Sequence, residues 1–395
     1  MEKNYSSKQV LTIVCFAVAI SVLITGFAFQ FFVIAPRNEL DAYNSKLSEI
    51  NNLVEKYYVG EVDKDVMANY LAAGYAAGLQ DKYAQYFSEE EAIESLNSFK
   101  GVNSGMGVQV SSHPDTLNML ILEIHKDSPA EKAGLRQGDQ IVKIDNNKIS
   151  EYGYSKALQY IKSKPLGSVI SLTILRNGKE KIVSVTLANY DSQSIFYKKM
   201  GDYGYIQITT FNNKSPEQFE TALNDLKAKG VKAFIFDLRG NGGGTLDSVN
   251  AMLDMLIPEG LMVKVEYKDP KYNEIYNSDK NEENLPMVIL TDESTASASE
   301  LFSQSLKDYG KAKTIGRKTY GKGVVQKTFS LSDGSLIKFT IGKYYTKNGN
   351  CLDGIGVTPD IAVEYSENEL KYRLINGLSK DKDFIAAKNY LDSLS

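Results

Sequence analysis

The sequence AFIFDLRGNGGGT, residues 233–245, sets the architecture of the largest part of this 395-residue chain. An uninterrupted apolar run leads into a glycine-rich turn, as is typical of a strand buried on both faces of a parallel sheet. GYIQIT at 204–209 and a helical segment from about Pro216 to Lys229 come before it, and MVIL at 287–290 comes after it. This alternation of strand and helix predicts an α/β core, to which we assign residues 189–366.

Before the core, residues 96–188 consist of short apolar runs separated by glycine, proline and asparagine turns. This pattern predicts a small strand-rich domain. Within it, SPAEKAGLRQGDQIVKIDNNKI at 128–149 resembles the signature of bacterial PDZ domains. The resemblance implies that a PDZ domain is inserted ahead of the core.

In that resemblance SGMGVQV at 104–110 is the carboxylate-binding loop and the strand that pairs with a peptide. Glycines at 105 and 107 allow successive backbone amides to converge on an anion, and a strand edge can accept an extended peptide. We therefore expect Gly105, Met106, Gly107 and Val108 to bind peptide. An ordinary glycine turn is the alternative.

The N-terminal segment carries no charged side chain from Gln9 to Pro36, and two lysines precede this run. About 20 apolar residues can cross a bilayer as a helix, and a basic flank predicts a cytoplasmic N-terminus. We expect a cytoplasmic tail over 1–9, a single transmembrane anchor over 10–35 and a body outside a bacterial cell membrane. The alternative, a cleaved secretory signal, also places the body outside.

The two ends of the remaining chain, 36–95 and 367–395, are expected to be helical. Leu40, Leu47 and Leu53 recur at helical spacing, and the C-terminal tail is polar and helix-forming. Apolar helical stripes without a domain of their own favour a dimerisation platform, so we expect a homodimer.

Composition excludes several classes of function. A formal net charge of −4 without a dense basic block argues against a nucleic-acid partner. The two histidines, His113 and His125, lie in the strand-rich domain, so the core has none for a Ser-His-Asp triad. No H-E-x-x-H zinc motif occurs, and we expect no metal and no cofactor. A serine hydrolase built on this core needs lysine as its base.

Serine and threonine are concentrated in TDESTASASELF at 291–302, directly after the strand MVIL. In one interpretation, Ser297 and Glu300 only form a capping box at the start of a helix. In the other, a serine at a strand-to-helix junction projects its hydroxyl, and the Ala298 amide favours negative charge at the helix N-terminus. Composition alone leaves Ser294, Thr295 and Ser299 as rivals.

The glycine turn also has two interpretations. Gly240, Gly242 and Thr245, with Glu266 beyond them, come close to a dinucleotide-binding fingerprint. Alternatively Gly242 or Gly243 offers a backbone N–H to a developing oxyanion, since glycine allows close approach.

GKGVVQ at 321–326 contains the lysine that could serve as base. A lysine between two glycines is usually an exposed turn residue, whereas a basic Lys322 must be desolvated so that its pKa falls. Gln326 could hold that amine. Four residues of straight strand would separate the two by roughly 13 Å, so the chain must bend at Gly323 if the two are to touch.

Together these segments, in this order and ending with GIGVTPDI at 354–361, resemble the carboxyl-terminal processing peptidases, also called tail-specific proteases. The resemblance implies Ser297 as nucleophile, Lys322 as base and Gln326 as the residue that orients it. The expected function is a PDZ-gated endopeptidase for extracytoplasmic polypeptides with free, largely apolar C-termini. Arg176, in the turn LTILRNGK, is a candidate link between the PDZ domain and the protease core, and a solvated hairpin arginine is the alternative.

Two alternatives come from other classes of protein. One is a catalytically inactive PDZ scaffold at the membrane, against which the presence of all three catalytic residue types argues. The other is a dinucleotide-binding oxidoreductase, which rests on the glycine run alone.

Overall fold

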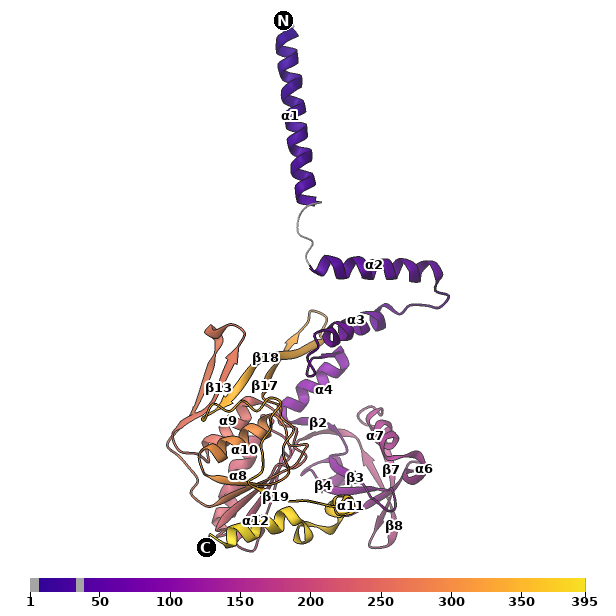
Figure 1. The fold of residues 1–395 in the computed structure, drawn as a ribbon. Helices are drawn as coiled ribbons and strands as arrows, with labels where there is room; N and C mark the ends of the chain where they lie inside the picture. Colours follow the sequence, from indigo (N-terminus) through magenta and orange to yellow (C-terminus); the bar gives the residue numbers. More distant parts are fainter. Residues whose placement is uncertain (1–6, 33–38, 395) are drawn as a thin grey trace. The chain divides into compact units, whose positions relative to one another are not determined.

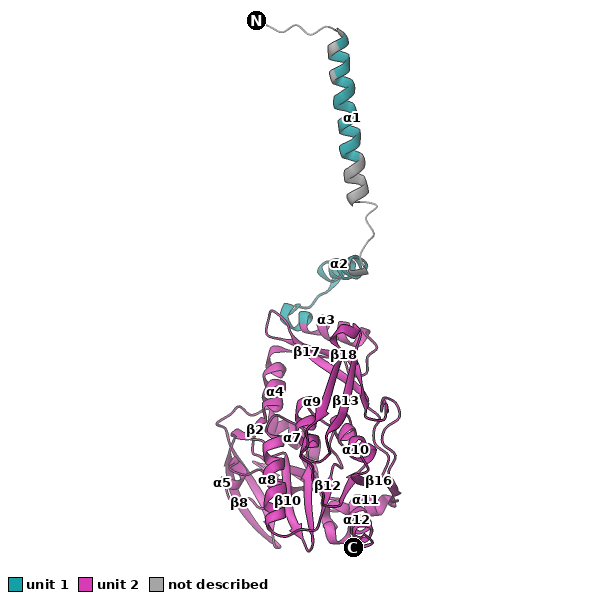
Figure 2. Cartoon of the chain, turned by 90° about the vertical axis from the view of Figure 1, so that its left-hand side faces the viewer, with its two compact units in different colours: residues 1–68 teal, residues 69–395 magenta. Residues whose placement is uncertain are grey.

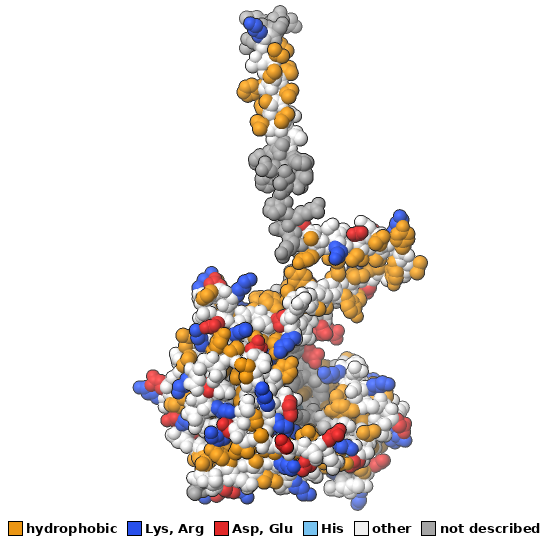
Figure 3. Space-filling model, viewed as in Figure 1, with side chains coloured by type: hydrophobic (Ala, Val, Ile, Leu, Met, Phe, Trp, Pro, Cys, Tyr) orange, Lys and Arg blue, Asp and Glu red, His pale blue; other side chains and the backbone are white. Residues whose placement is uncertain are grey.

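A computed structural model describes residues 7–32 and 39–394 (Figure 1). The chain forms two compact units, residues 1–68 and residues 69–395 (Figure 2). The first unit contains α1 (Ser7–Phe32), α2 (Glu39–Tyr57) and the beginning of α3 (Lys64–Gly78). Hydrophobic side chains are exposed along α2 (Figure 3), among them Leu47 and Leu53.

The structure does not support the transmembrane anchor predicted over 10–35. In the segments that the structure describes, no helix is both long enough and apolar enough to cross a membrane. Residues 1–6 of the predicted tail and 33–35 of the predicted anchor lie outside the described residues.

The second unit is built on a six-stranded sheet in the order β10-β11-β12-β15-β16-β19. All neighbours are parallel except the antiparallel pair β10–β11. Its strands are β10 (Ile195–Met200), β11 (Tyr203–Ile208), β12 (Ala233–Asp237), β15 (Met287–Thr291), β16 (Ala312–Gly316) and β19 (Ile361–Ala362). Every residue of β12 and β15 is buried, as their apolar runs predict.

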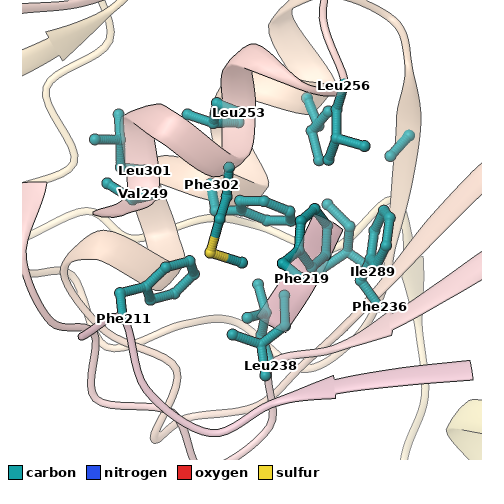
Figure 4. Packing of buried hydrophobic residues seen from close by; sticks show 14 of the residues in the cluster. Phe211, Phe219, Phe236, Leu238, Val249, Leu253, Leu256, Ile289, Leu301 and Phe302 are labelled. Carbon is teal, nitrogen blue, oxygen red and sulfur yellow. The ribbon is translucent and has the colours of Figure 1, made fainter. Parts of the chain in front are cut away.

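Helices cover both faces of this sheet. On one face α8 (Ser215–Ala228), α9 (Leu246–Asp254) and α10 (Ala298–Asp308) enclose the largest hydrophobic core. Phe219, Phe236 and Phe302 point into this cluster (Figure 4), and the ring centroids of Phe236 and Phe302 are 5.8 Å apart. On the other face α12 (Lys382–Asp392) packs Phe384 against Tyr205. The α/β core predicted from the sequence is confirmed.

A second sheet, β1-β18-β13-β14 with β17 beside β18, lies next to this core. Its strands are β1 (Gln85–Phe87), β13 (Gly260–Tyr267), β14 (Glu274–Ser278), β17 (Val324–Ser330) and β18 (Leu336–Thr346). The 3-10 turn η1 (Pro270–Tyr272) joins β13 to β14.

The inserted domain contains a separate sheet in the order β3-β4-β5-β7-β8, with β6 beside β5. Its strands are β3 (Val108–Ser112), β4 (Met119–Ile124), β5 (Gln140–Ile144), β6 (Asn147–Lys148), β7 (Val169–Arg176) and β8 (Lys179–Thr186). Its helices are α5 (Pro129–Lys132), α6 (Ile149–Tyr152) and α7 (Tyr154–Lys162). This domain has a hydrophobic core of its own.

Two short strands carry the chain into and out of this domain. β2 (Val102–Gly105) and β9 (Ala188–Asp191) pair antiparallel, with Gly105 opposite Ala188. Entry and exit of the inserted domain are therefore adjacent.

The helical prediction for 36–95 is wrong in one place. Residues 85–87 form β1, which pairs with β18, and a new helix α4 (Glu89–Lys100) then begins at the capping residue Ser88. A three-residue strand whose partner lies far along the chain leaves no local periodicity. The C-terminal region is helical as expected, with α11 (Glu367–Asn376), η2 (Leu378–Lys380) and α12.

Candidate active site

The candidate site lies where two turns follow the neighbouring strands β12 and β15. Ligands of α/β sheets bind at this carboxyl edge. The Ala296 N–H donates to the Asn241 carbonyl oxygen at 3.0 Å. A Cβ added to Gly243 would lie 2.9 Å from the Cβ of Ser297, so only glycine fits this packing. The glycine turn and the serine turn therefore lie backbone against backbone.

This packing argues against the dinucleotide-binding alternative. The serine turn occupies the space beside Gly243 that a pyrophosphate would need. Glu266, the acidic residue of the fingerprint, lies on β13 in the second sheet and pairs with Lys264. It is not placed to bind a ribose beside the glycine turn.

Ser297 adopts a strained backbone conformation at the start of α10, with φ 58° and ψ −119°. A positive φ is uncommon for a residue with a Cβ and is found where surrounding structure enforces it. Here Glu300 contributes, since its carboxylate accepts a hydrogen bond from the Ser297 N–H at 2.8 Å. The expected capping partners thus sit at a turn that also presents the serine.

The rival hydroxyl groups are placed differently. Thr295 and Ser299 are fully buried, and the Thr295 hydroxyl donates to the Leu238 carbonyl. Ser294 is exposed and does not line the cleft. Of these four residues, Ser297 alone lines the cleft described next.

A cleft of about 370 Å³ brings most of the predicted catalytic residues together. Gly242, Ser297, Ala298, Lys322 and Gln326 all line it. Gly243 is not among the residues that line the cleft. Ser297 and Lys322 thus face one space although they come from different turns.

Lys322 is half-buried in this cleft, and its Nζ lies 4.6 Å from the centroid of the Tyr83 ring. Burial lowers the pKa of the Lys322 ammonium, and the nearby charge of Lys338 lowers it further. The carboxylates of Asp81 and Glu300 act in the opposite direction. The lysine is therefore not an ordinary exposed turn residue.

Glu300 has a larger part in the site than the sequence indicated. Its fully buried carboxylate accepts hydrogen bonds from the N–H groups of Ser297, Gly321 and Lys322 at 2.8, 2.7 and 2.8 Å. The Thr319 hydroxyl donates a fourth at 2.5 Å. One side chain therefore holds the serine turn against the lysine turn.

Gln326 lines the cleft without contacting the lysine. Its Nε2 donates to the Val324 carbonyl at 3.4 Å, and no hydrogen bond joins it to Lys322 in the described part of the chain. β17 begins only at Val324 and bulges before Gln326, so the strand is not straight, but this irregularity does not join the two side chains by a hydrogen bond. A Cβ on Gly323 would lie 2.1 Å from the Asp353 nitrogen, so this loop position requires glycine.

The two oxyanion-hole candidates in the glycine turn differ in their hydrogen bonds. The Gly243 N–H donates to Oδ1 of Asn241 at 2.8 Å and is already occupied. Among the described residues, the N–H groups of Gly242 and Ala298 have no acceptor. These two amides are free to bind an oxyanion.

The four residues predicted to bind peptide lie at the start of the inserted domain. Gly107 has a positive φ of 80°, and a Cβ there would lie 2.3 Å from the Cβ of Ser128. In the described chain the N–H groups of Met106 and Gly107 have no acceptor. Val108 begins β3, whose one partner strand is β4, so its other edge is open. Gly105 belongs to the connecting strand β2.

Arg176 contacts only its own domain among the described residues. It forms a bidentate pair with Asp139 at 2.7 and 2.6 Å and donates to the Gly134 carbonyl at 2.8 Å. Neither a solvated hairpin arginine nor a direct contact with the protease core describes this geometry.

Other residues connect the inserted domain to the core. The Gln193 N–H donates to Nδ1 of His125 at 3.0 Å, and its side-chain oxygen accepts from the Lys126 N–H at 3.3 Å. Tyr372 of α11 donates to Asp115. No sequence pattern marked these residues, because each contact joins distant segments through single polar side chains.

Comparison with known proteins agrees with this geometry. Residues 202–363 match Peptidase family S41, and residues 104–187 match the PDZ domain. The chain is 31% identical over 382 residues to the "Probable CtpA-like serine protease" of Staphylococcus aureus (strain COL), covering 95% of this chain and 76% of that protein. The chain belongs to peptidase family S41.

A second relative of the same name, from Staphylococcus epidermidis (strain ATCC 12228 / FDA PCI 1200), is 30% identical over 86% of this chain and 68% of its own. A solved structure assigned to the S41 proteases, from Bacteroides fragilis NCTC 9343, has a TM-score of 0.61 at 19% identity. It covers 86% of this chain and 93% of its own and supports the fold. This S41 chain is a serine peptidase with a PDZ domain, which confirms the predicted family and enzyme class.

Proposed function

We propose that this S41 peptidase is a PDZ-gated endopeptidase in which Ser297 is the nucleophile and Lys322 the general base. The observation that carries the proposal is the shared cleft, which Ser297 and the half-buried Lys322 both line while Glu300 fixes their turns. An inactive scaffold would need neither the desolvated lysine nor the strained serine.

In the proposed reaction, neutral Lys322 takes the proton of the Ser297 hydroxyl as Oγ attacks the carbonyl carbon of the scissile bond. The oxyanion that forms is stabilised by the N–H groups of Gly242 and Ala298. The Lys322 ammonium returns its proton to the leaving amine as the C–N bond breaks, which leaves an acyl group on Ser297. Lys322 then deprotonates a water that hydrolyses this ester and regenerates the serine.

Lysine can act as base here because its environment disfavours the charged form. Burial and the Lys338 charge both lower its pKa and increase the neutral fraction near neutral pH. Gln326 is proposed to orient the amine once substrate fills the cleft. Its hydrogen bond to the Val324 carbonyl is long, at 3.4 Å, so the side chain is weakly held in its present position.

The PDZ domain is proposed to receive the free, apolar C-terminus of the polypeptide. The open edge of β3 and the free Met106 and Gly107 amides support this role. Gating through Arg176 would be indirect. The arginine fixes Asp139 after α5, and the segment before α5 contacts Gln193 of the core.

The test of the proposed function is a set of serine and lysine variants. Ser297→Ala and Lys322→Ala should each abolish turnover of a peptide substrate while circular dichroism stays unchanged. Ser299→Ala is the matched control, since its buried hydroxyl lies two residues away and should retain activity. EDTA should have no effect. Full activity of folded Ser297→Ala protein would refute the assignment, as would loss of activity in Ser299→Ala alone.

We also propose that the body acts outside the cytoplasm, since the uncharged run from Gln9 to Pro36, preceded by two lysines, is consistent with a secretory signal. Digestion of intact cells with added protease should remove the body. Protection equal to that of a cytoplasmic marker would contradict this location. New C-termini in secreted and membrane fractions of Ser297→Ala and wild-type cells would identify substrates.

A homodimer through 36–95 and 367–395 is the remaining proposal. Exposed apolar side chains on α2, including Ile50 and Tyr57, support it. Light scattering on a variant lacking residues 1–36 should give the dimer mass. A monomer at micromolar concentration would exclude it.

A further inference from the structure

The catalytic cleft contains a second lysine that the proposed reaction does not use. Lys338 lies on β18, opposite Thr328 of β17 on one side and Gln85 of β1 on the other. It lines the cleft together with Ser297 and Lys322. The residues that line the cleft include these two lysines and no carboxylate.

Lys338 also lacks an ionic partner. Its Nζ donates to Oε1 of Gln85 at 3.3 Å and lies 5.0 Å from the centroid of the Phe87 ring. In the part of the chain that the structure describes, no carboxylate lies within ion-pair distance of it. Burial lowers its pKa, and no neighbouring charge contributes to that shift.

Two other partly buried lysines of the described chain are paired. Lys307 lies 3.3 Å from Asp360, and Lys311 pairs with Glu282. A desolvated ammonium without a counter-ion is costly, so it is normally compensated by a partner or retained for a role. Lys338 lines the catalytic cleft without such a partner among the described residues.

We propose that Lys338 is a substrate-binding residue that takes a carboxylate of the polypeptide beside the scissile bond. This inference rests on the proposed function, because it places the carboxylate in the cleft where Ser297 acts. The rest of the lining suits an apolar neighbour, with Phe99, Leu246, Leu301 and Val325 facing the same space. The preferred ligand is therefore an apolar segment with one carboxylate.

Two sources can supply that carboxylate. A free C-terminus brings its α-carboxylate when cleavage occurs close to the chain end, and an acidic residue brings a side chain when cleavage is internal. Both accept the same charge-assisted hydrogen bond from an ammonium group.

Substrate binding at Lys338 also affects the base. The Lys338 charge lowers the pKa of Lys322, so a bound carboxylate that neutralises it allows that pKa to rise. The rise of kcat with pH should therefore lie at higher pH for the acidic member of a substrate pair.

The test uses two pairs of short apolar peptides that differ in one charge. One pair ends in a free acid or an amide, and the other contains Glu or Gln near the cleavage site. Each preference is measured as a ratio of kcat/KM within one enzyme, so a general change in activity cancels. Wild type should prefer the acidic member of at least one pair by about ten- to hundredfold, as for one charge-assisted hydrogen bond.

Lys338→Met should bring that ratio close to one, mainly through KM, and Lys338→Arg should retain it. Lys327→Met is the matched control, an exposed lysine on the adjacent strand β17 that should leave the ratio unchanged. The pair that responds identifies the source of the carboxylate. Because the PDZ domain is present in every variant, its own preference for C-termini cancels in the comparison.

Equal rates within both pairs in wild type, or an unchanged ratio in folded Lys338→Met, would overturn the inference while leaving Ser297 as nucleophile. If instead Ser297→Ala protein cleaves as wild type does, the proposed function fails. Peptide binding to Ser297→Ala, with and without Lys338→Met, then decides the inference from affinity alone. If Lys338→Met does not fold, Lys338→Gln replaces it.

Discussion

At the scale of single residues, the carboxylate of Glu300 is the hydrogen-bond acceptor that joins the turns of the site. Its two oxygens accept four hydrogen bonds, from the Thr319 hydroxyl and from the N–H groups of Ser297, Gly321 and Lys322. All four partners are donors, so the position requires a group that only accepts. Four hydrogen bonds compensate the free-energy cost of removing this carboxylate from water.

Glu300→Gln should therefore impair both stability and catalysis. The amide replaces one acceptor oxygen with an NH2 group that faces two donors, which leaves buried N–H groups without partners. We expect a loss of about 2–4 kcal/mol in the free energy of unfolding. The fall in kcat/KM should exceed about a hundredfold if the two turns shift by even 1 Å. Urea denaturation and kinetics measure the two effects.

The control is Glu293→Gln, since Glu293 lies on the same turn, pairs with Arg317 and is 68% exposed. Its effects on stability and rate should be small. If Glu300→Gln behaves like this control, Glu300 does not hold the turns together.

The pH dependence of the rate tests Lys322 directly. The lysine must lose its proton before it can act as base, so kcat/KM should rise with pH through its pKa. Burial and Lys338 lower that pKa, which places the rise below the roughly 10.4 of free lysine. A pH–rate profile from pH 6 to 10 in wild type checks this expectation. A flat profile between pH 6 and 9 would argue against lysine as base.

The sequence predicted some of these residues and could not predict others. Ser297 and Lys322 lie in short motifs that carry the family resemblance. Glu300 could be predicted only as a capping partner, because three of its four donors come from a turn far along the chain. The choice between Gly242 and Gly243 depends on one side-chain hydrogen bond of Asn241 that no pattern indicates.

At the scale of secondary structure, periodicity predicted the α/β core well. The helix expected from Pro216 to Lys229 is α8, and the buried runs after it are β12 and β15. Prediction succeeds there because α8 is a long amphipathic helix, whereas the two strands are continuous apolar runs buried on both faces. It failed at β1, which is three residues long and is stabilised by pairing with β18.

The C-terminal helix α12 depends on a buried ionic cluster. Asp381 caps it by accepting from the N–H of Asp383 at 3.0 Å and also accepts from Arg239 at 2.8 Å. Arg239 in turn forms a bidentate pair with Asp237 at the end of β12. The helix is thus joined to the strand that leads into the glycine turn.

Asp381→Ala should destabilise the protein by about 2–3 kcal/mol, since Arg239 keeps its pairs with Asp237 and Asp383. It removes the helix cap and leaves the buried Arg239 guanidinium with fewer acceptors. Thermal and urea unfolding measure the loss. Lys382→Ala, at the residue after Asp381, is the control. It removes a surface ion pair with Glu369 and should lower the free energy of unfolding by less than about 1 kcal/mol. Equal stability of the two variants would exclude a structural role for the cluster.

At the scale of the whole molecule, the PDZ domain is an insertion that can be removed at one point. It leaves and rejoins the core through β2 and β9, in which Gly105 pairs with Ala188. A variant in which an Asn-Gly turn replaces residues 106–187 keeps this ribbon as a two-residue hairpin. This design follows from the register, whereas the sequence showed only that a strand-rich domain ends near 188.

This excision distinguishes gating from tethering. If the domain restrains the site until a C-terminus binds, the excised variant should cleave a short unstructured peptide at least as fast as wild type and lose selectivity for apolar C-termini. If the domain only concentrates substrate, kcat/KM should fall for long substrates and stay constant for short ones. We expect the first result.

Arg176→Ala should show the same trend more weakly, because the arginine acts through Asp139 rather than on the core. Both variants are assayed with both substrates after their unfolding curves show an intact core, and unchanged rates throughout would mean that the PDZ domain has no part in turnover.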